Sequence, residues 1–148
     1  MYIGLLHLHN AGRWLVLVAA VVAIVIAVLG LVRGAPRGRG AKLSGLAYVI
    51  MMDTQLVIGM VLYGTSPLVR AAMGDMSLAM ADTQLRFFLV EHFLLMVAAV
   101  ALVHVGYALS KRASTAKAAY TRASIFYTLG LVAVVAGIPW WRPLFPGA

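Results

Sequence analysis

The most constraining feature of this sequence is the run from Trp14 to Val32, which contains no charged side chain. A helix of about 20 apolar residues crosses the hydrocarbon core of a bilayer, which is about 30 Å thick. The apolar pattern extends back to about Leu5, so the first span covers about residues 5–32. Similar stretches follow at about residues 43–66, 86–110 and 125–141. The sequence therefore predicts an all-α integral membrane protein, with residues 1–148 forming one four-span domain.

The basic residues predict how these spans are arranged. The loops after the first and third spans are short, carry most of the 12 Lys and Arg residues and contain no acid. Short basic loops stay in the cytoplasm, so we expect both termini outside, with Trp14, Trp140 and Trp141 near the outer boundary. Short loops also join antiparallel neighbours, which predicts an up-down-up-down bundle. This topology accounts for the net charge of +8, and we expect the lipid bilayer rather than nucleic acid as the partner.

Absent residues and motifs narrow the possible chemistry. The chain has no cysteine, which excludes disulfides, cysteine-ligated iron–sulfur clusters and thioether-attached haem. It also lacks an HExxH motif, a P-loop, a GxSxG motif and a glycine-rich dinucleotide fingerprint. A carboxylate cluster of the kind that holds two irons in a bundle is missing too. Hydrolytic chemistry therefore has no visible machinery in this sequence.

His9 and His92 are the main candidates for metal ligands. Ionisable side chains within a membrane span are rare and usually functional. The first and third spans run in the same direction, and His9 and His92 lie one to two turns inside them. Their imidazoles should therefore lie at similar depth, where they could hold one haem b as its two axial ligands. The alternative is that both are boundary residues tolerated near the water interface.

Two arginines could accompany this haem. His7 and His9 are two residues apart and cannot share a helix face, so at most one points into the bundle. We favour His9, because Arg13 follows one turn later on the same side. Arg13 could pair with a haem propionate, and Arg86, which precedes His92, could do the same.

His104 lies roughly 18 Å deeper than His92 along an ideal helix, so it cannot bind the same metal. It could ligate a second haem together with Met51 or Met52, or it could hydrogen-bond Asp53, which needs a partner inside the membrane. We favour the bond to Asp53, and hence one haem rather than two. Glu91 points away from the face of His92; we expect an ion pair with a nearby arginine, with proton transfer at a quinone site as the alternative.

Four segments resemble short four-span bacterial proteins usually labelled "cytochrome B". They are HNAGRWLVL from His9, DTQLVIGMVLYGTSPLV from Asp53, RFFLVEHFLLM from Arg86 and SIFYTLGLVAVVAGIPWWRP from Ser124. The most specific pieces are HxxxRW and RFFxVEH. The resemblance implies a b-type haem protein of the bacterial inner membrane, and the matching positions are His9, Arg13, His92 and His104.

Three functions remain open from the sequence. The first is a haem b electron-transfer protein or subunit that exchanges electrons with a quinone or a larger redox complex. The second is a cofactor-free structural subunit of a respiratory or photosynthetic complex, whose histidines bond neighbouring helices. The third is a metal or proton transporter, which should show a continuous polar route; the polar residues here are scattered, so we rank it last.

Overall fold

A computed structural model describes residues 2–142 and is helical almost throughout, with no strand in that range. The long helices are α1 (Tyr2–Val32), α2 (Arg39–Thr65), α6 (His92–Lys111) and α7 (Ala116–Gly137). Three short helices connect α2 to α6, namely α3 (Pro67–Gly74), α4 (Met76–Ala81) and α5 (Thr83–Arg86), followed by a π-helical segment, η1 (Phe87–Glu91). The predicted all-α four-helix bundle is confirmed.

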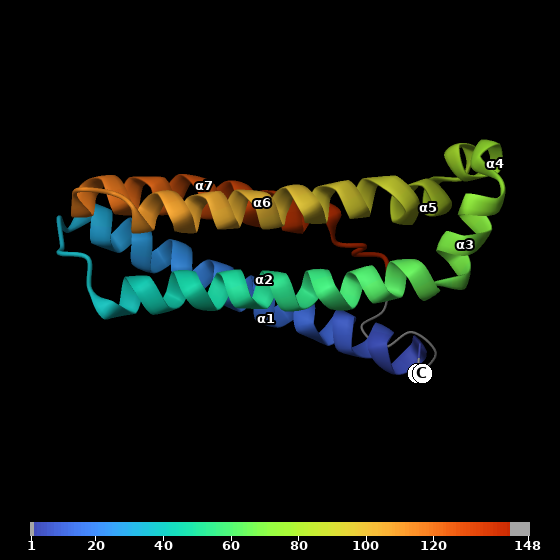
Figure 1. Cartoon of the computed structure of the whole chain (residues 1–148), viewed down its shortest axis with the longest axis horizontal. Helices are drawn as coiled ribbons and strands as arrows, with labels where there is room; N and C mark the ends of the chain where they lie inside the picture. The colour runs from blue at the N-terminus through green and yellow to red at the C-terminus, as the bar shows by residue number, and fades with distance from the viewer. Residues whose placement is uncertain (1, 143–148) are drawn as a thin grey trace.

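Four helical segments are long and apolar enough to cross a membrane, as expected for a multi-pass membrane protein. They are Tyr2–Val32, Arg39–Thr65, Thr83–Lys111 and Ala116–Gly137. In Figure 1 the long helices run side by side, with the loop at 33–38 at one end and α3 to α5 at the other. α1 packs against α2 and α7, while α6 packs against α7 and α2. This ring of neighbours is the predicted up-down-up-down order. Which end faces outward remains a prediction from the charges.

The bounds of the fourth span differ most from the prediction. The helix begins at Ala116 rather than near Ile125, because the side-chain oxygen of Thr115 accepts a hydrogen bond from the Ala118 N–H at 3.1 Å and caps the helix. It ends at Gly137, so Pro139 follows the helix instead of lying in its last turn. The polar sequence between residues 116 and 124 is therefore the first part of α7 and not a loop.

The connection between α2 and α6 consists of the three short helices α3, α4 and α5. Each short helix starts at a side-chain cap: Ser66 for α3, Asp75 for α4 and Asp82 for α5. The carboxylates of Asp75 and Asp82 accept hydrogen bonds from the Leu78 and Leu85 N–H groups at 2.9 and 2.8 Å. These acids therefore set the ends of helices, as short acidic side chains commonly do.

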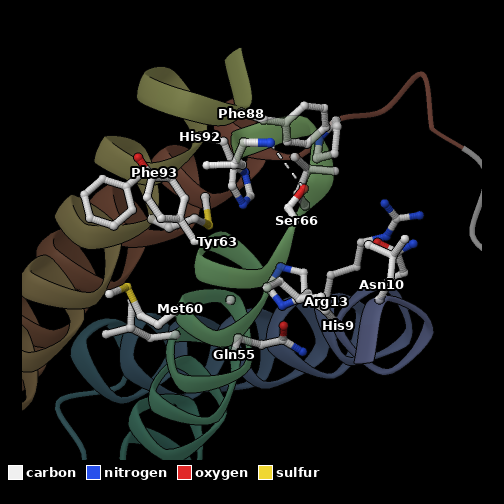
Figure 2. A pocket seen from close by; sticks show the side chains of 18 of the residues that line it. His9, Asn10, Arg13, Gln55, Met60, Tyr63, Ser66, Phe88, His92 and Phe93 are labelled. Carbon is white, nitrogen blue, oxygen red and sulfur yellow. Dashed lines mark hydrogen bonds between the residues drawn. The ribbon is translucent and has the colours of Figure 1, made fainter. Parts of the chain in front are cut away.

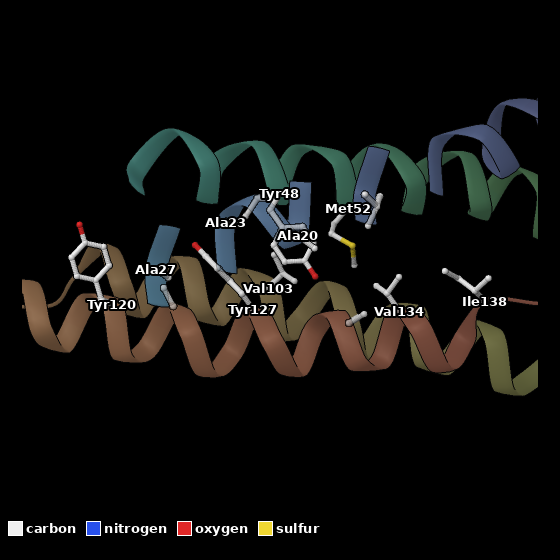
Figure 3. Packing of buried hydrophobic residues seen from close by; sticks show 14 residues of the cluster. Ala20, Ala23, Ala27, Tyr48, Met52, Val103, Tyr120, Tyr127, Val134 and Ile138 are labelled. Carbon is white, nitrogen blue, oxygen red and sulfur yellow. The ribbon is translucent and has the colours of Figure 1, made fainter. Parts of the chain in front are cut away.

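The two halves of the bundle are packed differently. We call the end that contains the start of α1, the short helices and residue 142 the histidine end; a pocket lies between the helices there (Figure 2). Towards the other end, α1 presents the small residues Ala20, Ala23 and Ala27, which are buried against its neighbours (Figure 3). Tyr48 and Tyr127 meet edge to face there, with ring centroids 5.6 Å apart. This half is a filled core between the helices.

Candidate functional site

The pocket at the histidine end draws its lining from all four long helices and from α3. Its volume is about 140 Å³. Most of its wall is apolar, and the polar side chains come mainly from α1 and α2. The polar and charged side chains in the wall include His9, Asn10, Arg13, Gln55, His92 and Arg142. In Figure 2, His9 and His92 extend from different helices towards the same space.

His92 is held in one orientation by the end of α7. Its Nδ1 lies 2.7 Å from the carbonyl oxygen of Gly137, the last residue of that helix. Helix-terminal carbonyls lack a partner within their own helix, and a carbonyl can only accept. Nδ1 must therefore carry the proton in this bond. In the neutral ring, Nε2 then has a free lone pair, which is the protonation state that a metal-binding imidazole needs.

The turn of helix directly before His92 is a π turn, formed by η1. The His92 N–H bonds the Phe87 carbonyl, five residues back, instead of the usual four. Tyr63 of α2 donates its hydroxyl to the Leu89 carbonyl within this segment, at 2.9 Å. Single π turns inside α-helices are frequent at functional sites. Here the turn anchors the start of α6 to α2, directly beside the pocket.

His9 faces His92 across a short gap. Their ring centroids are 6.3 Å apart, with the ring planes at 79°. A metal–imidazole nitrogen bond is about 2 Å long, and a ring centroid lies ~1 Å beyond the nitrogen, so two imidazoles on one metal have centroids ~6 Å apart. The angle between the planes is free, because each ring can turn about its own nitrogen–metal axis. The observed separation thus suits two axial ligands of one iron.

A glycine on α2 makes room for His9. A Cβ added at Gly59 would lie 3.3 Å from Cε1 of His9, closer than such contacts normally are. The Nδ1 atom of His9 is buried and has no hydrogen-bond partner. The His9 ring therefore packs against the backbone of α2 at Gly59, and its Nδ1 makes no hydrogen bond. A buried nitrogen without a hydrogen bond is unusual for a histidine whose only role is packing.

Two further donors on α1 are buried without partners. They are Nδ2 of Asn10, a residue only 6% exposed, and Nε of Arg13. A buried donor that makes no hydrogen bond is destabilising by about 1–3 kcal/mol. Arg142, also in the pocket wall, stacks its guanidinium over Phe88 at 4.3 Å. The pocket thus offers several donors and suits a ligand with acceptor or anionic groups.

Of the residues predicted from sequence, the structure brings His9, Arg13 and His92 together in this pocket. The expectation that His9 rather than His7 would face inward agrees with it, since His7 is not among the lining residues. Arg86 is not in the lining either. Its Nε bonds the Glu91 carboxylate at 2.8 Å, which confirms the ion pair expected for Glu91.

His104 lies outside the pocket and contacts Asp53, with Nε2 and Oδ1 3.4 Å apart. This agrees with the favoured interpretation from sequence, and it leaves His104 away from the only pair of facing histidines among the described residues. Met52 is instead part of the apolar core. The structure therefore gives no support to a second haem held by His104 and a methionine.

Sequence reasoning missed Asn10, Gln55 and Gly59 as parts of this site. Asn10 follows His9 directly and precedes Arg13 by three residues, so a polar side chain in an otherwise apolar helix was the available signal. Gln55 lies against Gly12 of α1, where any side chain at position 12 would displace its amide. That close approach depends on tertiary packing and has no signature in the local sequence.

No protein-family model, no curated protein and no solved structure matches this chain. Within residues 2–142, no cluster of three or more His, Asp or Glu side chains could hold a metal ion. Zinc sites are almost always built from three or four protein ligands. His9 and His92 alone supply fewer ligands than such a zinc site needs.

Proposed function

We propose that this chain is a membrane-embedded, b-type haem electron-transfer protein or subunit. One haem b would be held between α1 and α6 by the imidazoles of His9 and His92, with His92 binding through Nε2. The observation that carries this proposal is the 6.3 Å separation of the two imidazole centroids. It is supported by the resemblance of HxxxRW and RFFxVEH to short bacterial "cytochrome B" proteins.

The surrounding residues have distinct roles in this proposal. The Gly137 carbonyl, 2.7 Å from Nδ1 of His92, fixes the tautomer and makes the ligating nitrogen more basic. Arg13 and Asn10, whose buried donors have no protein partner, would bind the propionate carboxylates. Gly59, which has no side chain, lets the His9 ring pack directly against the backbone of α2.

A bound haem supplies one-electron chemistry, and the protein sets its potential through ligand type, hydrogen bonds and burial. The pocket wall is mostly apolar, which excludes water from the group. Electrons would pass to or from a membrane quinone or a larger redox complex in the bacterial inner membrane.

The decisive experiment is an absorbance spectrum and a pyridine haemochrome assay of the purified full-length protein. We expect reduced-minus-oxidised b-type bands that are lost in His92→Ala and in His9→Ala. His104→Ala is the matched control, because it removes a histidine from the same helix as His92 but outside the pocket. Equal haem content in His92→Ala and the unaltered protein would refute the ligand assignment.

A cofactor-free structural subunit is the second candidate, and one contact favours it. The His92–Gly137 hydrogen bond already joins α6 to α7, so His92 has a structural role even without a ligand. A colourless preparation that co-purifies with larger subunits, even when cells are supplied with a haem precursor, would establish this function in place of the first.

A further inference from the structure

Asp53 and His104 form an ionisable pair on the outside of the bundle. Nε2 of His104 lies 3.4 Å from Oδ1 of Asp53, and the two side chains are 45% and 47% exposed. Nδ1 of His104 lies 2.9 Å from the Val100 carbonyl, so it carries a proton there. The pair therefore places an acidic and a basic side chain in contact on the outside of the bundle.

This pair lies within the membrane-spanning part of α2 and α6. Asp53 is near the middle of the span Arg39–Thr65, and His104 is two turns before the end of the span Thr83–Lys111. Its neighbours on the same surface are exposed apolar residues, Ile50 and Val57 on α2 and Val105 on α6. Ionisable side chains in membrane proteins almost always face the bundle interior or a water-filled cavity. An acid–base pair that faces lipid is therefore expected to be covered by another protein surface.

A second copy of this chain is the partner whose charges fit. The acid and the base lie side by side at one depth, on two neighbouring helices. A two-fold axis along the membrane normal would place each Asp53 opposite the other copy's His104, because such an interface is self-complementary. The four groups would then alternate in sign around the axis. Both ring nitrogens of His104 are engaged within their own chain, so the attraction between the copies would come from the opposite charges of the facing side chains and not from a new hydrogen bond.

We infer that the α2–α6 face, centred on Asp53 and His104, is the interface of a parallel homodimer within the membrane. The exposed side chains next to His104 on α6 include the small residues Ala98 and Ala101. Small residues allow membrane helices to approach closely. This inference does not depend on the haem proposal, since neither Asp53 nor His104 lines the pocket.

Cysteine cross-linking tests this directly, because the natural chain contains no cysteine. Ala101→Cys places a thiol one turn from His104 on the proposed interface. Val132→Cys is the matched control: Val132 is 60% exposed on α7, within a turn of Gly130, which packs on Val103 of α6. In membranes treated with an oxidant, we expect Ala101→Cys to form a covalent homodimer several-fold more than Val132→Cys. Equal cross-linking of both variants, or cross-linking of Ala101→Cys only to a different protein, would overturn the inference.

Charge exchange tests the role of the pair in the same assay. In the Ala101→Cys background, Asp53→His leaves only bases and His104→Asp leaves only acids, so each should reduce cross-linking several-fold. The double variant with both changes restores one acid and one base and should restore the dimer. If either single variant fails to accumulate in the membrane, the cross-linked homodimer formed by the double variant still tests the role of the pair. Failure of a folded double variant to cross-link would contradict the alternating arrangement.

Discussion

At the scale of single residues, Gly59 is the position where a side chain would most directly disturb His9. A Cβ at Gly59 already approaches Cε1 of His9 to 3.3 Å, and a valine adds two methyl groups. We expect Gly59→Val to displace the imidazole and, if haem binds there, to reduce haem content severely; overpacking of this kind is destabilising by about 1–3 kcal/mol. Gly64→Val is the control, since a Cβ at Gly64 of the same helix meets nothing within 4 Å. Haem content and thermal unfolding of both variants are the measurements.

Arg13 and Arg86 make a second test, because both were candidates for binding propionates. Arg13 lines the pocket with a buried, unpaired Nε, whereas Arg86 is engaged by Glu91 and by the Met80 carbonyl. We expect Arg13→Ala to lower haem retention during detergent washing, and Arg86→Ala to leave it close to that of the unaltered protein. The partly exposed Arg86–Glu91 pair should change stability by only about 0–1 kcal/mol. A larger haem loss in Arg86→Ala than in Arg13→Ala would contradict this placement of the propionates.

Residue-level prediction from sequence worked where helix periodicity decides the outcome. His9 and Arg13 are about one turn apart and share a helix face, whereas His7 lies on another, and the pocket contains His9 and Arg13 but not His7. It failed where the backbone departs from regular helix. Because η1 is a π-helical segment, ideal α-helical angles do not describe how Arg86 is oriented relative to His92. The buried donors of Asn10 and the glycine beneath His9 depend on contacts between helices, which no local pattern encodes.

At the scale of elements, the start of α7 depends on a single cap. The Thr115 side chain accepts the Ala118 N–H at 3.1 Å, and an N-cap of this kind contributes about 1 kcal/mol. Thr115→Ala should lower the free energy of unfolding by about that amount, seen as a fall in the unfolding midpoint of the purified protein. Ser114→Ala, at the exposed neighbouring position, should leave the midpoint unchanged. Equal effects of the two substitutions would mean that the cap does not set the start of this helix.

The elements also show why span bounds were harder to predict than span number. Hydropathy found four spans because each contains a long apolar stretch. It could not predict where α7 begins, because the first turns of that helix carry Lys117 and Arg122. Those turns form because Thr115 caps them and because Ala119, Tyr120 and Ala123 are buried. Similarly, the caps at Ser66, Asp75 and Asp82 divide the weakly apolar connection into three helices. Capping and tertiary burial, rather than hydrophobicity, decide these ends.

At the scale of the whole molecule, the orientation of the bundle in the membrane decides which compartment the pocket faces. The loop at 33–38 and the turn at 112–115 lie at one end of the bundle, with basic residues around both, while the pocket lies at the other end. Positive residues in short loops remain on the cytoplasmic side. We therefore expect the pocket to lie towards the outer surface, with both termini there. Periplasmic reporter fusions should be active after residue 148 and inactive after Arg37, and fluorescent-protein fusions should give the reverse pattern. An inactive periplasmic reporter at residue 148 would place the pocket on the cytoplasmic side, and any electron donor or acceptor would then have to reach it from there.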